Sequence, residues 1–311
     1  MVNKKLAVQF ALAIAIICFL VYKANPLKVV AALSKTNPLW LLTAIALFIF
    51  INLFVPFGMK LFFNPISNIK LRKWLKYYIY TISASQVIPG KIGDFILVYF
   101  LKKEGIKTGE SAALIILDKL IVILVALVLA AIGIKVLLVE STIYWGIIGA
   151  VILLTGGILV ISPPGTALIR KIIGKYSSKF PGFSMAIKRM VLQHSPRLFL
   201  NLVMIVFRFF LLSVYFYSIF RGMGISAPIL IMMPLFAITA ITSLIPLTPN
   251  GLGVRESVGL VLFGKIGVGT EIAISAYLID LTLNYLLASL GLYFFIKNKE
   301  LARLREERQS N

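Results

Sequence analysis

The chain has 311 residues, of which 60% are hydrophobic and 14% are charged, and its formal net charge is +21. Its mean hydropathy of +0.98 excludes a soluble domain, and its long, uniformly apolar runs exclude the alternating strands of a β-barrel. Cys18 and His194 are each alone of their kind, which excludes an internal disulfide and a thiolate metal cluster. The sequence predicts an all-α polytopic membrane protein.

Apolar runs long enough to cross a bilayer recur along the chain. A hydrocarbon core about 30 Å thick needs about 20 residues at 1.5 Å per residue. Full spans are predicted at residues 6–22, 39–63, 111–139, 143–161, 198–220 and 272–296. The first lacks a small-x-small cleavage site and is expected to be a retained span rather than a signal peptide. Asn52 and Pro56-Phe57-Gly58 predict a kink in the second.

Two further apolar regions are interrupted before they reach that length. The runs at 77–88 and 95–101 lie on either side of Pro89-Gly90, and those at 228–246 and 258–263 flank the segment LTPNGLG. Two half-length helices joined by a Pro/Gly break are typical of a re-entrant hairpin, although two short, tilted spans would give the same pattern. We therefore expect six full spans and two re-entrant hairpins, or eight spans if the hairpins cross.

The first break and the helix after it occur twice in the sequence. When the sequence is aligned with itself at a shift of 162 residues, an acid, a glycine, a threonine and an aspartate each align with a residue of matching type. The aligned pairs are Asp94 and Glu256, Gly105 and Gly267, Thr108 and Thr270, and Asp118 and Asp280. The sequence predicts two repeats, at about 6–139 and 143–296, within a single membrane domain of residues 1–296.

Loop charge predicts the orientation of these segments. With both termini cytoplasmic, the cytoplasmic segments 4–5, 60–76, 102–107, 170–197 and 297–308 carry 22 Lys and Arg, and the outer segments carry six. In this layout the hairpins enter from opposite sides, so the repeats are inverted, with about three spans and one hairpin each. A charged cytoplasmic tail follows at 297–311, and the protein is expected in the plasma membrane.

The basic residues lie in short loops, which favours anionic lipid head groups and the membrane surface, and not nucleic acid, as the partner. The basic cytoplasmic loop at 163–197 has apolar residues between its charges. It is expected to form an interfacial amphipathic helix pair or, equally, a solvated loop that includes His194.

Each break is expected to expose the N-terminus of a half-helix near the middle of the membrane, where unpaired N–H groups and the helix dipole favour an anion such as phosphate. The candidate substrate-binding residues are Pro89, Gly90, Lys91, Gly93 and Asp94 in the first copy and Pro249, Gly251, Gly253, Arg255 and Glu256 in the second. The alternative is a pair of flexible turns in which Lys91 and Arg255 snorkel.

Polar side chains within apolar segments form a second group of candidates, because such residues usually face a cavity or a partner. The candidates for a polar cavity or a coupling role are Asp118, Lys119, Arg208, Tyr277, Asp280 and Asn284. Structural ion pairing, for instance of Glu256 with Arg255 or Arg208, is the alternative. Nothing in the sequence forms a catalytic, metal-binding or nucleotide-binding set, so we expect neither enzyme activity nor a cofactor.

Two motifs resemble a known family. They are Pro89-Gly90-x-x-Gly93-Asp94, followed by Gly105 and the acid–base pair Asp118-Lys119, and Pro246-x-x-Pro249-x-Gly251-x-Gly253-x-x-Glu256. Over about residues 5–296 the chain resembles the membrane domain of the lysylphosphatidylglycerol synthase/flippase family, including the UPF0104 group of stand-alone proteins. The resemblance implies movement of lipid between leaflets. Long members carry an aminoacyl-transferase domain in addition, which the resemblance implies is absent from a chain ending at Asn311.

Two departures from the family pattern bear on specificity. Asp118-Lys119 stands where Glu-Arg is expected, and Asp280 stands where many members have Arg. The head group recognised is therefore expected to differ.

The first functional hypothesis is a flippase-like transporter of an anionic phospholipid or a polyprenyl-phosphate-linked lipid. The alternatives are an ion-coupled transporter of a small anionic solute and an accessory subunit that presents lipid to a separate glycosyl- or aminoacyl-transferase.

Overall fold

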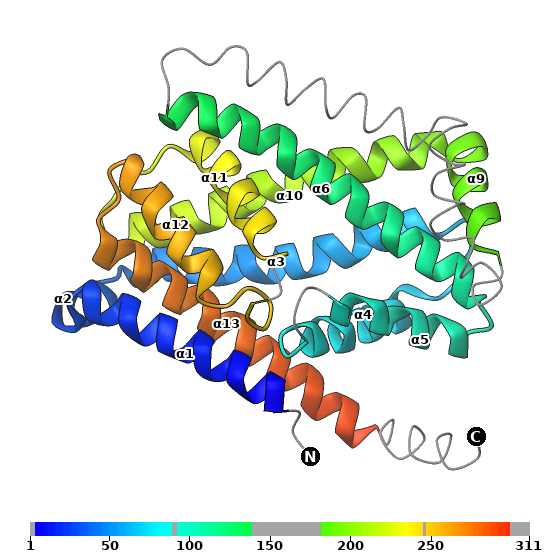
Figure 1. Ribbon diagram of the computed structural model, residues 1–311, viewed down its shortest axis with the longest axis horizontal. Helices are drawn as coiled ribbons and strands as arrows, with labels where there is room; N and C mark the ends of the chain where they lie inside the picture. Colours follow the sequence, from blue (N-terminus) through cyan, green and yellow to red (C-terminus); the bar gives the residue numbers. More distant parts are fainter. Residues whose placement is uncertain (1–3, 89–91, 139–181, 245–246, 299–311) are drawn as a thin grey trace.

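The computed structural model describes residues 4–88, 92–138, 182–244 and 247–298, and the regular structure in these ranges is helical (Figure 1). The predicted span at 143–161, most of the basic loop and nearly all of the tail lie outside the described residues.

Four long helices form the frame. They are α3 (Pro38–Phe63), α6 (Thr108–Leu138), α10 (Ser195–Gly222) and α13 (Thr270–Lys297). Each is long and apolar enough to cross a membrane, as predicted, and they run lengthwise through the molecule in Figure 1. The chain is therefore a multi-pass membrane protein. The residues predicted to kink this span, Asn52 and Pro56-Phe57-Gly58, lie inside the single helix α3, where the side-chain amide of Asn52 donates to the carbonyl of Phe48 at 2.9 Å.

The two ends of this frame differ in the helices that they hold. At the α9 end, on the right of Figure 1, α3 finishes, α6 and α10 begin, and α9 (Phe183–Gln193) packs against α6. At the α2 end, on the left, α10 finishes and α3 and α13 begin. The amide of Asn37 donates to the carbonyl of Gly222 at 2.8 Å there, which ties the start of α3 to the last residue of α10.

The N-terminal segment forms two helices. The predicted first span is α1 (Lys4–Lys23), and α2 (Pro26–Ser34) follows at an angle of 84°. Asn25 makes this corner: its φ of 64° is left-handed, and its side chain caps α2 by accepting from the amide of Leu27 at 3.1 Å.

Both predicted breaks separate short helices. The first lies between α4 (Leu71–Ser85) and the 3₁₀ turn η1 (Ile92–Phe95), which leads into α5 (Ile96–Lys103); the second lies between α11 (Ile229–Thr242) and α12 (Val254–Lys265). The longest of these, with 15 residues, reaches about 22 Å, too short for a hydrocarbon core. In Figure 1, α4 begins and α5 ends at the α9 end, whereas α11 begins and α12 ends at the α2 end.

An aromatic core holds each hairpin in place. In the first, Phe100 of α5 stacks on Tyr77 of α4 with ring centroids 4.8 Å apart. In the second, Phe263 of α12 packs between Phe216 of α10 and Tyr277 of α13. All these rings are buried, so each short helix is fixed by packing rather than by its own length.

The helix α9 is the part of the predicted amphipathic loop that the structure describes. Its buried face, which includes Phe183 and Met190, contributes to the core around α5 and α6. The opposite face exposes Met185 and Leu192 together with Lys188 and Arg189. Exposed apolar and basic side chains on one helix are what an interfacial helix presents to a membrane surface.

Candidate functional site

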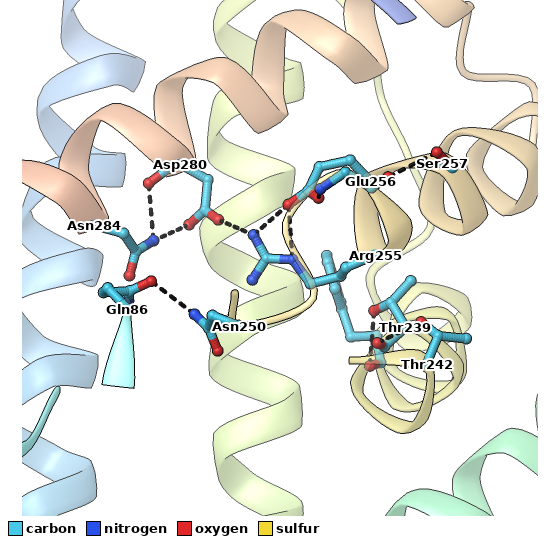
Figure 2. Close-up of polar contacts among 11 residues, drawn as sticks. Gln86, Thr239, Thr242, Asn250, Arg255, Glu256, Ser257, Asp280 and Asn284 are labelled. Carbon is cyan, nitrogen blue, oxygen red and sulfur yellow. Dashed lines mark hydrogen bonds and ion pairs between the residues drawn. The ribbon is translucent and has the colours of Figure 1, made fainter. Parts of the chain in front are cut away.

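A cluster of charges lies at the start of α12. The guanidinium of Arg255 donates to Oε1 of Glu256 at 2.7 Å and to Oδ2 of Asp280 on α13 at 3.2 Å (Figure 2). The amide of Asn284 donates to Oδ1 of Asp280 at 2.9 Å. We call Arg255, Glu256 and Asp280 the second cluster.

The backbone around Gly253 explains why this cluster forms. Gly253 has a φ of 84°, and an added Cβ would lie 2.9 Å from side-chain atoms of Ile16 on α1, so glycine is required for both conformation and space. Its amide donates to Oε2 of Glu256 at 2.6 Å, which is the half of a capping box that the N3 side chain makes. The positive end of α12 is thus neutralised by a fully buried carboxylate of the chain itself.

A first cluster of the same kind lies between η1 and α6. Lys119 places its Nζ 2.7 Å from Oδ2 of Asp94 and 3.8 Å from Oδ2 of Asp118. Ser85, the last residue of α4, donates to Oδ1 of Asp94 at 2.7 Å, and Asn201 of α10 donates to Oδ1 of Asp118 at 3.1 Å.

The two clusters share one design, because each holds a cation between an acid of the hairpin and an aspartate of the following long helix. The cation comes from the long helix as Lys119 in the first cluster and from the hairpin as Arg255 in the second. In each cluster the cation is the most exposed member, at 33% for Lys119 and 27% for Arg255, against 0% for Glu256 and 8% for Asp280. The accessible charge in both is therefore positive.

The two breaks touch each other midway along the molecule. The side-chain amide of Asn250 donates to Oε1 of Gln86, which directly follows α4, at 2.7 Å (Figure 2). In each break a glycine also packs closely against a serine at the end of the preceding helix. A Cβ added to Gly93 would lie 2.5 Å from Cα of Ser85, and a Cβ added to Gly251 would lie 2.8 Å from Cα of Ser243.

Buried polar atoms collect beside the second cluster. Among the described residues, Oγ1 of Thr248, Oδ1 of Asn250 and the hydroxyl of Tyr277 are buried without a hydrogen-bond partner. The ring of Tyr277 lies 6.0 Å from the Arg255 guanidinium, within cation–π range. Since buried polar groups are normally paired, these atoms are suited to hydrogen bonding with a ligand or water.

The sequence-predicted residues divide into three groups. Those placed in or directly beside the clusters and breaks are Gly93, Asp94, Asp118, Lys119, Pro249, Gly251, Gly253, Arg255, Glu256, Tyr277, Asp280 and Asn284. Pro89, Gly90 and Lys91 lie outside the described residues. Arg208 is exposed on α10 and belongs to neither cluster, so Glu256 pairs with Arg255 and not with Arg208.

Sequence reasoning missed four polar residues of the site, which are Ser85, Gln86, Asn201 and Asn250. Asn201 had a usable signal, since an amide inside an apolar run needs a partner. Asn250 had another, since it stands beside Gly251 in the second break.

These features define a multi-pass helical membrane protein with two broken hairpins, each carrying a charge cluster. Residues 6–291 match the family described as the lysylphosphatidylglycerol synthase TM region, and the chain belongs to this family, which confirms the resemblance seen in the sequence. The chain is also similar to a UPF0104 membrane protein of Methanothermobacter thermautotrophicus, with 28% identity over 74 residues. That alignment spans 24% of this chain and 21% of the relative.

Proposed function

We propose that this protein moves an anionic lipid between the leaflets of the plasma membrane, with both termini cytoplasmic, and that it acts as a transporter and not as an enzyme. The duplicated charge cluster is the observation that carries the proposal. In each copy an accessible cation, Lys119 or Arg255, is held by more deeply buried carboxylates. Such a cation can exchange a carboxylate for a phosphate of similar charge and geometry.

The arrangement of the hairpins supplies a mechanism. They start from opposite ends of the molecule and meet at Gln86 and Asn250, as the two halves of an inverted repeat would (Figure 1). If the halves exchange conformations, each cluster becomes accessible in turn from one end and then from the other. Because a phosphate competes with the carboxylates for the same cation, protonation of a carboxylate favours binding, which would couple lipid movement to a proton gradient.

Family membership supports a lipid as the transported molecule, because the matching domain is named for lysylphosphatidylglycerol synthase, a protein that makes a lipid. The substrate class proposed here is broader: a phosphatidylglycerol derivative or a polyprenyl-phosphate-linked lipid. A separate lipid-modifying transferase is proposed as the source or the consumer of that lipid.

Leaflet exchange in proteoliposomes tests this proposal. Fluorescent phosphatidylglycerol, a fluorescent polyprenyl phosphate and fluorescent phosphatidylcholine are placed in separate vesicles, and the fraction reaching the outer leaflet is measured by chemical quenching. Acceleration of an anionic lipid but not of phosphatidylcholine is expected. Lys119→Gln should reduce the rate strongly, whereas Lys265→Gln, the loss of an exposed cation at the far end of α12, should not.

Absence of acceleration for every anionic lipid tested would contradict the proposal. If such vesicles instead take up a soluble anion such as phosphate, the protein is a solute transporter. Exchange that appears only after a transferase is reconstituted with the protein would identify an accessory subunit.

A further inference from the structure

A groove of about 1390 Å³ lies away from the residues of both charge clusters. It is lined by the turn before α4 and one face of α4, by the turn between α5 and α6 with the first turn of α6, and by the end of α13. None of the acids or cations of the two clusters lines it. Small-molecule pockets usually measure about 300–1000 Å³, so this groove can hold more than an inorganic anion.

The charge of the groove is positive. The basic residues that line it are Lys70, Arg72, Lys73, Lys76 and Lys107, and the acidic ones are Glu104 and Glu110. One of the two acids is paired within the protein, since Glu104 accepts hydrogen bonds from Lys73 at 2.7 Å and from the hydroxyl of Tyr77 at 2.6 Å. Lys70 and Arg72 are exposed, and Nζ of Lys76 lies 5.7 Å from the centre of the Tyr80 ring.

Apolar side chains complete the lining. They are Ile66, Ile69, Leu75, Ile79, Ile106 and Phe294. At the floor, Asn298 donates to the hydroxyl of Tyr80 at 3.2 Å, which links the end of α13 to α4. A groove that is basic and apolar together matches an amphiphile with an anionic head better than it matches a free inorganic anion.

We propose that this groove is a docking site for the phosphate-bearing head group of an anionic phospholipid. The phosphate lies against Lys70, Arg72 and Lys76, and the glycerol and the first methylenes of the chains lie against the apolar residues. The groove stands at the ends of the long helices, where the head groups of one leaflet lie. The assignment does not depend on transport, because a lipid can bind here whether or not the protein moves it between leaflets.

Native mass spectrometry of the purified full chain tests the assignment by counting bound phosphatidylglycerol over a concentration series. The triple variant Lys70→Gln/Arg72→Gln/Lys76→Gln removes the cations and leaves Lys73 to hold Glu104. The matched control Lys28→Gln/Lys35→Gln/Lys265→Gln removes three exposed cations that do not line the groove. Three juxtamembrane charges, at about 1 kcal/mol each, predict a loss of affinity of roughly 100-fold in the triple variant and little change in the control.

The lipid and the salt chosen as probes decide the remaining alternatives. Phosphatidylcholine should bind weakly to all three proteins, and 10-fold more inorganic phosphate than lipid should not displace phosphatidylglycerol. Equal binding by the triple variant and the control would overturn the assignment. Displacement of phosphatidylglycerol by inorganic phosphate would also overturn it, because the groove would then be a site for a soluble anion. Circular dichroism and gel filtration of both variants check that binding is compared between folded proteins.

Discussion

Asn250 and Gln86 stand 164 residues apart in the sequence, and the hydrogen bond between their side chains, 2.7 Å long, joins the two breaks. Each residue belongs to a different hairpin, so a movement that separates the two breaks must break this bond. A hydrogen bond of this kind contributes about 0.5–1.5 kcal/mol to stability, which is small enough to be broken during a transport cycle.

Linking the two breaks covalently should therefore stop transport. With Cys18→Ser as background, Gln86→Cys and Asn250→Cys can be joined by a short bifunctional thiol reagent that is cleavable by a reductant. We expect leaflet exchange to fall to the rate of protein-free vesicles and to recover after reduction. Each single-cysteine variant, treated identically, controls for modification alone; normal exchange by fully crosslinked protein would mean that the breaks do not separate.

The orientation of the two hairpins can be measured by labelling. Thr108 opens α6 at the α9 end and Thr270 opens α13 at the α2 end (Figure 1). Single cysteines at these positions, again with Cys18→Ser, should react with a membrane-impermeant maleimide from opposite sides of the membrane. Single cysteines at the neighbouring exposed positions, Lys107→Cys and Lys265→Cys, check that each side is accessible to the reagent. Labelling of the cysteines at 108 and 270 from the same side would refute the inverted repeat.

The glycines of the second hairpin should differ in their tolerance of alanine. Gly251 and Gly267 both have left-handed φ values, of 73° and 81°, which costs about 1–2 kcal/mol for alanine. Only at Gly251 would the new Cβ meet backbone, at 2.8 Å from Cα of Ser243, whereas nothing lies within 4 Å at Gly267. Overpacking adds about 1–3 kcal/mol, so Gly251→Ala should lower the apparent melting temperature more than Gly267→Ala. Equal losses in the two variants would mean that the contact relaxes freely.

Glu104 at the α9 end should make stability depend on pH. Burial opposes ionisation there, but hydrogen bonds from Lys73 and Tyr77 outweigh it and lower the pKa of Glu104 from its ordinary 4.5. A lowered carboxyl pKa contributes stability above pH 4.5, and that contribution is lost as pH falls through the folded-state pKa. The gap in apparent melting temperature between wild type and Glu104→Gln should thus narrow below pH 4.5. Since Lys73 is 50% exposed, the effect is at most about 1 kcal/mol; a gap that widens in acid would contradict it.

Four of the six long spans and the positions of both breaks were predictable from the sequence, because span length and Pro/Gly interruptions are local signals. The repeat also predicted that Asp118 and Asp280 would occupy matching places. The cation of the first cluster was not predictable in the same way. The sequence suggested Lys91 as the counterpart of Arg255, because both lie in a break. In the structure the cation paired with Asp94 is Lys119 of α6.

The cross-helix partners depend on tertiary packing that a single sequence does not encode locally. Asn201 and Asp118 are 83 residues apart, and the groove is assembled from three separate segments. By contrast, Glu256 stands three residues after the helix-starting Gly253, the place of the acid in a capping box, so the carboxylate at the start of α12 was predictable from the sequence.

The second cluster gives the sharpest test of how the buried charges are balanced. Glu256 is fully buried and receives hydrogen bonds from Arg255 and from the amide of Gly253. Arg255→Gln would leave that carboxylate without its cation, which typically costs about 3–5 kcal/mol. The double variant Arg255→Gln/Glu256→Gln removes both charges, and its amide oxygen at position 256 can still accept from Gly253, so part of the lost stability should return.

Thermal unfolding in detergent measures this cycle, with Lys119→Gln as the matched single variant of the first cluster. Lys119→Gln should cost less, about 1 kcal/mol, because its partner Asp94 is 21% exposed and solvent screens the remaining charge. If the double variant is less stable than Arg255→Gln alone, removing the unpaired carboxylate restores no stability. The Arg255–Glu256 pair would then not be the balance of charge that keeps α12 folded.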